Sequence, residues 1–209
     1  GHHTYDEDQE VAPNDLYDLA SLTKILSATL AVMKLEEEGK VELDTPIVHY
    51  LPELAGSDKA DLVLRDILAH RAGLKDWIPF YKQTIYKYRR RVRQRDGYYR
   101  RSAADGFNLE VADRLFLRDD LADSIYQQIY RSPLRPSAGY NYSDLGFYLL
   151  HKLVERRTGL ALDDFVETMF YRPMGLTRMT YNPLNLYGKR HIVPTELDTV
   201  FRNQLIHGH

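Results

Sequence analysis

The sequence of 209 residues contains no cysteine. This absence excludes disulfide bonds, thiolate metal sites and a cysteine nucleophile, so any nucleophile is an oxygen or an amine. No apolar run approaches the roughly 18 residues that a membrane span needs, and residues 1–10 lack the apolar stretch of a signal peptide. We therefore predict no membrane span and no signal peptide in this chain.

An excess of one charge sign is also missing. Twenty-eight Lys and Arg residues face thirty Asp and Glu residues, which gives a formal net charge of −2 and no pervasive positive field for a polyanion. Hydrophobic residues at 44% and charged residues at 28% are typical of a folded globular chain. We predict one domain with a single main core.

Several well-known site motifs are absent. The sequence has no Gly-x-Ser-x-Gly elbow, no phosphate-binding loop and no dinucleotide-binding glycine fingerprint, so we predict no cofactor. The closest histidine pairs, His2 with His3 and His207 with His209, have no third ligand at a useful spacing. We therefore predict no metal site.

Apolar spacing predicts helices over residues 20–38, 62–68, 145–157 and 162–171. Gly39 and Gly159 follow two of these segments as stop signals. Strand signals are scarce, and the sequence from Thr177 onward is typical of a loop.

Residues 82–101 carry nine basic side chains and one acidic side chain, with tyrosines between them, and residues 105–123 are acidic. One interpretation is a grip on single-stranded nucleic acid through phosphate contacts and stacking. We favour an insertion in a helical subdomain near the rim of the active site, partly paired with the acidic stretch, and we predict no nucleic-acid partner. Arg89, Arg90 and Arg91 would then steer an anionic substrate.

The sharpest local pattern is Ser21-Leu22-Thr23-Lys24, at the start of the first predicted helix. Residues three apart share a helical face, so the Lys24 amine can take the proton of the Ser21 hydroxyl if that amine is neutral. We expect nearby cations and burial to keep it neutral. The unpaired Ser21 N–H at a helix start can also face an oxyanion. Taken alone, the pattern also fits an exposed serine and a solvated lysine.

A second pattern, Tyr142-Ser143-Asp144, directly precedes the helix predicted over 145–157. A tyrosine hydroxyl beside a cationic amine can shuttle a proton to a leaving group. The alternative is that Ser143 or Asp144 caps the helix while Tyr142 packs in the core.

Together the two patterns resemble the serine β-lactamase and penicillin-binding-protein superfamily, most of all the class C β-lactamases and their esterase and D-alanyl-D-alanine peptidase relatives. Further matches follow in the order of that family: Tyr17-Asp18-Leu19-Ala20-Ser21, Leu43-Asp44-Thr45-Pro46-Ile47, Ile67-Leu68-Ala69-His70-Arg71-Ala72-Gly73-Leu74 and Pro173-Met174-Gly175-Leu176.

The resemblance implies an α/β (α+β) fold, with a mainly helical subdomain and an antiparallel sheet part. It implies that Ser21 is the acylated nucleophile, Lys24 its proton acceptor and Tyr142 the group that protonates the leaving group. Asp144 stands in a substrate-binding position where the family often has Asn, and an ionised carboxylate cannot donate to a substrate carbonyl. His70 would order a turn.

The family's third motif is expected beyond residue 209, so we predict a module truncated at both ends, with a helical subdomain over about 22–175 and a partial α/β part from the termini. The predicted activity is acyl transfer to water on a β-lactam, a D-alanyl peptide amide or an ester. The substrate would be a small molecule or a cell-wall peptide, and the parent protein would be periplasmic or secreted. The alternative is a non-catalytic module of a larger cell-wall-processing protein, for example one with a glycoside hydrolase. The sequence leaves the oligomeric state open.

Overall fold

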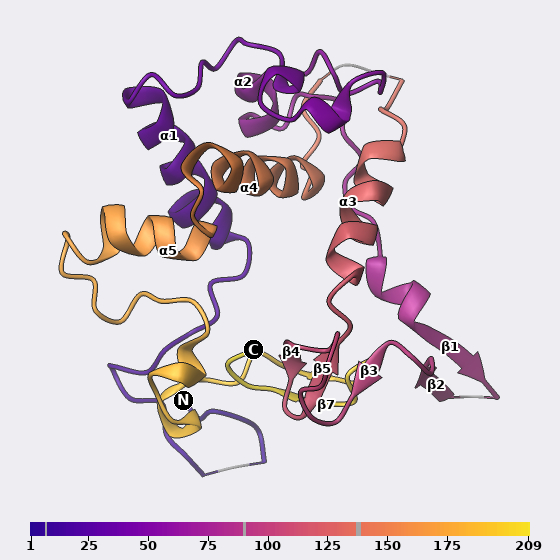
Figure 1. Ribbon diagram of the computed structural model, residues 1–209. Helices are drawn as coiled ribbons and strands as arrows, with labels where there is room; N and C mark the ends of the chain where they lie inside the picture. The colour runs from indigo at the N-terminus through magenta and orange to yellow at the C-terminus, as the bar shows by residue number, and fades with distance from the viewer. Residues whose placement is uncertain (7, 90, 137–138) are drawn as a thin grey trace. The chain divides into compact units, whose positions relative to one another are not determined.

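The computed structural model describes residues 1–6, 8–89, 91–136 and 139–209, which form two compact units (Figure 1). The helical unit consists of Ala20–Ile78 and Ser124–Met179. The strand unit consists of Gly1–Leu19, Pro79–Asp123 and Thr180–His209. The helical range predicted over residues 22–175 is thus interrupted, because residues 79–123 group with the two terminal segments.

The helical unit is built from α-helices and two π-helical segments. Its elements are η1 (Lys24–Thr29, π), α1 (Leu30–Glu37), η2 (Ile47–His49), η3 (Pro52–Leu54), α2 (Leu64–Leu68), all but the first turn of α3 (Leu121–Arg131), α4 (Leu145–Thr158), α5 (Leu162–Val166) and η5 (Glu167–Tyr171, π). The α4 helix packs against α1, α2 and α5 (Figure 1). Its buried face follows the helical period through Leu145, Leu149 and Leu153.

Two features of α4 follow directly from glycines. Gly159 ends the helix in the left-handed conformation, with φ 72°, and its N–H donates to the carbonyl of Glu155. Gly146 lets α4 approach α2 closely, because a Cβ at this position would lie 2.8 Å from Ile67 Cγ2. The predicted helix over 145–157 and its stop at Gly159 are confirmed.

Two other predicted helices are less regular than their apolar spacing suggests. The segment predicted as one helix over 20–38 contains the π-helical η1 followed by α1. The segment over 162–171 consists of α5 followed by the π-helical η5. These two π segments contact one another, since the Tyr171 hydroxyl donates to the carbonyl of Leu26 at 2.8 Å. A π-helix carries an extra residue per turn, which apolar periodicity does not reveal.

The described residues of the strand unit form seven short antiparallel strands: β1 (Ile85–Tyr88), β2 (Arg91–Gln94), β3 (Tyr99–Arg100), β4 (Leu109–Ala112), β5 (Leu115–Leu117), β6 (Glu196–Asp198) and β7 (Gln204–Ile206). β1 pairs with β2, β6 pairs with β7, and β3, β5 and β4 make a three-stranded sheet in that order. The unit also contains the short 3₁₀ turns η4 (Phe80–Thr84), η6 (Pro183–Asn185) and η7 (Lys189–His191). A small core joins Ala112, Leu115 and Ile206.

The strand unit corrects two expectations about local structure. The segment after Thr177 contains the β6–β7 hairpin, so it is not all loop. The basic segment forms β1, β2 and β3 of the strand unit instead of an insertion in the helical unit. Both expectations failed because strands of two to four residues are too short to show an alternating pattern.

The predicted pairing of the basic and acidic stretches also differs from the structure. Within the described residues, no ion pair joins a basic side chain of 82–101 to an acidic side chain of 105–123. Arg89 and Arg93 lie over the ring of Tyr88 instead, with their guanidinium carbons 5.6 and 5.1 Å from its centroid. Arg90 lies outside the described residues.

The helices and small antiparallel sheets make the mixed α/β architecture that the sequence predicted. In the part of the chain that the structure describes, no helix has the length and apolar character needed to cross a membrane. The same residues contain no group of three or more His, Asp or Glu side chains that could hold a metal ion.

Candidate active site

Ser21 lies in an exposed turn at the start of the η1 segment. The residue before it, Ala20, has φ 44°, a left-handed conformation that costs energy for a residue with a side chain. This backbone turn places Ser21 so that its carbonyl accepts from the Lys24 N–H at 3.1 Å. Among the described residues, the Ser21 N–H has no backbone acceptor, as a helix start allows.

Lys24 brings the predicted site residues together. Its Nζ donates to Ser21 Oγ at 2.9 Å and lies 2.8 Å from Asp144 Oδ1. The same ammonium lies 5.3 Å from the ring centroid of Tyr142 and 5.9 Å from that of Phe147. All of these residues belong to the helical unit.

The expectation of a neutral Lys24 amine is wrong for this arrangement. Burial alone lowers the pKa of Lys24, but hydrogen bonds with Asp144 and Tyr142 outweigh it and hold the pKa above its usual value. The nearest charge to Nζ is the Asp144 carboxylate, which stabilises the ammonium form. Lys24 is therefore a cation at neutral pH.

Tyr142 shows the opposite shift. Hydrogen bonds with Ser21 and Lys24 lower the pKa of its hydroxyl from the usual 10.0, although some burial opposes this. Tyr142 is 43% exposed, so solvent and a substrate can reach it. A phenol that ionises more easily beside a fixed ammonium is suited to accept a proton from the Ser21 hydroxyl.

The two residues after Tyr142 have different tasks. Ser143 is buried, and its Oγ accepts from the Leu145 N–H at 3.1 Å and donates to the carbonyl of Lys75. Ser143 thus ties the start of α4 to the 74–76 segment. Asp144 makes no side-chain cap bond to α4; its carboxylate points instead to Lys24.

The sequence interpretation missed how His70 supports Tyr142. The His70 ring lies against the Tyr142 ring, with centroids 4.4 Å apart. A His-x-x-Gly-Leu segment indicated an ordered turn, but no local pattern connects it to a tyrosine so distant in the sequence. The contact exists because α2, which ends just before His70, packs on α4.

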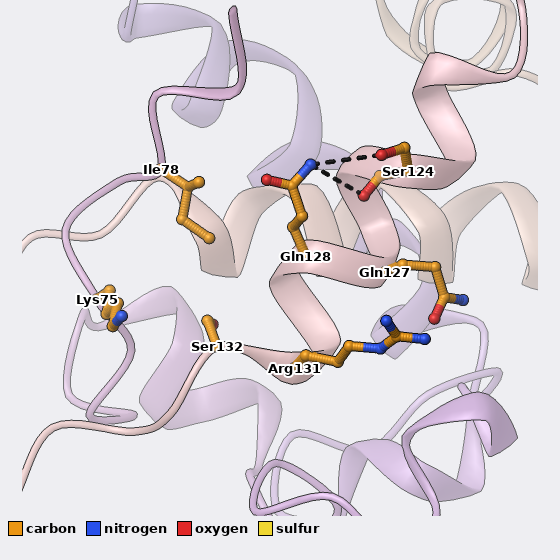
Figure 2. Close-up of a pocket in the computed structure, with 7 residues that line it drawn as sticks. All are labelled: Lys75, Ile78, Ser124, Gln127, Gln128, Arg131 and Ser132. Atoms are coloured by element: carbon orange, nitrogen blue, oxygen red, sulfur yellow. Dashed lines mark hydrogen bonds between the residues drawn. The ribbon is translucent and has the colours of Figure 1, made fainter. Parts of the chain in front are cut away.

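A separate cleft of about 390 Å³ lies in the same unit, between α3 and residues 75–78. Figure 2 shows its lining, with Gln128 donating to the carbonyl and hydroxyl oxygens of Ser124. It contains none of the four predicted site residues, and no sequence motif marked it. Its lining residues are Lys75, Ile78, Ser124, Gln127, Gln128, Arg131 and Ser132.

Comparison with known families decides what this arrangement belongs to. Residues 1–190 match the family model described as Beta-lactamase. The chain belongs to the β-lactamase family. A relative from Escherichia coli (strain K12), provisionally named D-alanyl-D-alanine carboxypeptidase, is 33% identical over 201 residues. The match covers 92% of this chain and 40% of the relative, so the chain spans well under half the length of that protein.

Solved structures show the same fold. The octameric penicillin-binding protein homologue from Pyrococcus abyssi aligns with a TM-score of 0.66 at 18% identity, covering 99% of this chain and 42% of that one. A class C β-lactamase solved in complex with cefoxitin aligns with a TM-score of 0.59 at 21% identity, covering 89% of this chain and 42% of that one. The β-lactamase/transpeptidase-like fold predicted from the motifs is confirmed.

Proposed function

We propose that this β-lactamase-family chain carries the nucleophile of a serine hydrolase that transfers an acyl group to water through an ester on Ser21. The observation that carries the proposal is the contact of three groups: Lys24 Nζ at 2.9 Å from Ser21 Oγ, and the Tyr142 hydroxyl bonded to both. Nucleophile, cation and proton acceptor then lie within one hydrogen-bonded cluster.

The pKa directions of Lys24 and Tyr142 support one path for the proton. The Tyr142 phenolate removes the Ser21 hydroxyl proton while Oγ forms a bond to the substrate carbonyl carbon, and the carbonyl electron pair moves onto its oxygen. The Lys24 ammonium keeps its proton and stabilises the phenolate. This differs from the role that the resemblance implies for Lys24, because the ion pair with Asp144 opposes loss of the Lys24 proton.

The second half of the reaction follows from the same groups. When the carbonyl re-forms, the bond to the leaving group breaks, and the leaving group takes the proton from Tyr142. Water then repeats the sequence at the Ser21 ester, with Tyr142 accepting its proton and returning it to Ser21 Oγ. The Ser21 N–H provides one donor for the oxyanion.

For the whole protein we propose cell-wall peptides that end in D-alanine, or the corresponding esters and β-lactams, as substrates. The carboxypeptidase name of the Escherichia coli relative supports this choice. A periplasmic or secreted location follows from the same proposal. We expect the third motif, with a second oxyanion donor, beyond residue 209. Removing one such donor typically costs about 10²–10³ in rate, so the 209-residue chain should acylate slowly.

The test is intact-protein mass spectrometry after incubation with a fluorescent penicillin and, separately, with an activated D-alanyl ester. Four proteins are compared: the 209-residue chain, a chain extended to the length of the matched relatives, and Ser21→Ala in each. Ser102→Ala, an exposed serine of the strand unit, is the matched control. We expect one acyl adduct, lost in Ser21→Ala and retained in Ser102→Ala.

The non-catalytic alternative has one observation in its favour, the ion pair between the Asp144 carboxylate and the Lys24 ammonium. Absence of any adduct in the extended chain with both reagents would support that alternative. An adduct that persists in Ser21→Ala would remove Ser21 as the nucleophile.

A further inference from the structure

His70 holds the segment around Tyr142 from both sides. Its backbone carbonyl accepts from the Asn141 N–H at 2.8 Å, and its ring Nδ1 accepts from the Ser143 N–H at 3.1 Å. The two residues that flank Tyr142 are therefore bonded to one histidine. His70 itself has φ 55°, a strained conformation that this double contact maintains.

The His70 ring also fixes the Tyr142 ring. The two rings are tilted by 32° at a centroid distance of 4.4 Å, and the Phe147 ring lies 5.5 Å from His70. The Tyr142 ring contacts the His70 ring and lies 5.3 Å from Lys24 Nζ, and these two contacts set its direction. That direction carries its hydroxyl to Ser21.

The hydrogen bond to Ser143 demands one protonation state. Nδ1 accepts an N–H only when it carries no proton, so the imidazole is neutral with its proton on Nε2. The charged and titratable groups that face His70 are Lys24 from η1, and Tyr140, Tyr142 and Asp144 from the segment before α4. Burial and the Lys24 charge lower the pKa of His70, and Asp144 opposes them only in part.

We propose that His70 is a positioning residue, which as a neutral imidazole holds the Tyr142 hydroxyl on Ser21 and Lys24. The proposal rests on the proposed acyl transfer and adds a proton condition to it. Below the pKa of His70, the protonated ring loses its bond from Ser143 and places a second cation beside Lys24. Tyr142 then leaves the position in which it accepts the Ser21 proton.

Two variants separate the backbone, the acceptor and the ring. His70→Asn tolerates the left-handed backbone and keeps an acceptor on Cγ, where Nδ1 is attached, but has no titrating ring. His70→Gly tolerates the backbone and has neither acceptor nor ring. His49→Asn, an exposed histidine of the same unit, is the matched control.

The first measurement is the pH dependence of kcat/KM for acylation by a neutral ester in the extended chain. If free enzyme must have both Tyr142 ionised and His70 neutral, log kcat/KM rises with a slope of about 2 below the pKa of His70 and about 1 above it. We expect His70→Asn, which keeps the acceptor but loses the ring, to show a slope of about 1 throughout and a rate at pH 8 between those of wild type and His70→Gly. His70→Gly should lose about 10²-fold in kcat at pH 8 with little change in KM. A slope of 2 that persists in His70→Asn, or wild-type rates in His70→Gly, would overturn the proposal.

The second measurement needs no activity. In NMR spectra of the 209-residue chain, we expect the Nε2-protonated tautomer of His70. In His70→Gly we expect faster exchange of the Ser143 amide and shifted Tyr142 ring signals; His70→Asn should largely restore the slow exchange of the Ser143 amide but not the Tyr142 ring signals. Unchanged Ser143 and Tyr142 signals in His70→Gly would refute the positioning role. If these signals behave as expected while the wild-type protein forms no acyl adduct, the hold on Tyr142 stands and the proposed function fails.

Discussion

The helical unit and the strand unit bury very different cores. In the helical unit, fully buried leucines from several elements meet around α4, among them Leu35, Leu64 and Leu149. The described core of the strand unit is a cluster of Ala112, Leu115 and Ile206, and turns held by ion pairs supplement it. The residues that we assign to chemistry all lie in the unit with the larger core. A site that depends on distances near 3 Å needs elements that cannot shift, and α4 and η1 meet that need.

The strongest test of this difference between the two cores is to truncate one buried leucine in each of them to alanine. Leu149→Ala should cost about 3–5 kcal/mol of unfolding free energy, because the elements packed against α4 keep the cavity open. Leu115→Ala should cost about 2 kcal/mol, because short strands collapse more easily around the space. Urea unfolding measures both values. Equal costs would show that the two cores are equally rigid.

The stability of the strand unit should depend more than that of the helical unit on single turns held by a charged side chain. The Asp198 carboxylate accepts from the N–H groups of Val200, Phe201 and Arg202 and pairs with the Arg202 guanidinium. Burial raises the pKa of Asp198, but the bonds with Arg202 and the backbone outweigh it and lower the pKa below 3.8. Asp198→Asn should cost about 2 kcal/mol at pH 7.

The pH dependence of this cost has a definite sign. A lowered pKa in the folded state gives stability that is complete above the unfolded pKa and is lost as the pH falls through the folded value. The unfolding free energies of wild type and Asp198→Asn should therefore converge below about pH 3.8. Asp105→Asn, an exposed residue of the same unit, is the control. A gap that stays constant from pH 7 to pH 3 would contradict the assignment.

A change at the site should alter rate without altering the core. Asp144→Asn removes the carboxylate that holds the Lys24 proton and that raises the pKa of Tyr142. The lower pKa of Tyr142 makes its phenolate more available as long as Lys24 keeps its proton, and one pKa unit corresponds to about a tenfold gain in acylation rate at pH 7. Stopped-flow measurement of adduct formation tests this, with Asp61→Asn as an exposed control in the same unit. A slower Asp144→Asn variant would mean that the carboxylate assists the reaction.

The smallest expected effect concerns a single methyl group. Gly146→Ala places a Cβ 2.8 Å from Ile67 Cγ2, and the strain exceeds the gain in helix propensity, for a net cost of about 1 kcal/mol. The strand-unit counterpart is Gly188→Ala, where no atom lies within 4 Å of the new Cβ and φ is −71°. This control should stay within about 0.5 kcal/mol of wild type in thermal unfolding. A neutral Gly146→Ala would show that Ile67 can move away.

The same contrast explains what the sequence could predict. The helix α4 has a long buried face and ends at Gly159, so its secondary structure can be predicted from its own residues. A two-residue strand such as β3 is held by its partner, and nothing in its own letters predicts it. The spacing of Ser21 and Lys24 predicted that these two are neighbours, and the family resemblance added Tyr142 and Asp144 to the same site. It could not show that Lys24 is charged, because that depends on where the Asp144 carboxylate points.

The contact of His70 with Tyr142 was beyond prediction for the same reason. It arises from the packing of two helices that the sequence predicts separately. Such contacts between distant segments decide protonation states. The sequence therefore predicts which residues form the site better than it predicts their chemistry.

The π-helical turn at Lys24–Thr29 sets the rotation of the Ser21–Lys24 pair around the helix axis relative to the buried face of the helix that follows. Successive residues of a helix rotate by about 100° around its axis, so one additional residue in the turn sets the angle between the Ser21–Lys24 pair and the buried face of α1. Removing one residue from this segment would restore an ordinary helix and leave the α1 core face in place. It would also turn the hydroxyl and the amine about a quarter of a circle away from Tyr142. The length of this turn is therefore as strictly fixed as the identity of the two residues it presents.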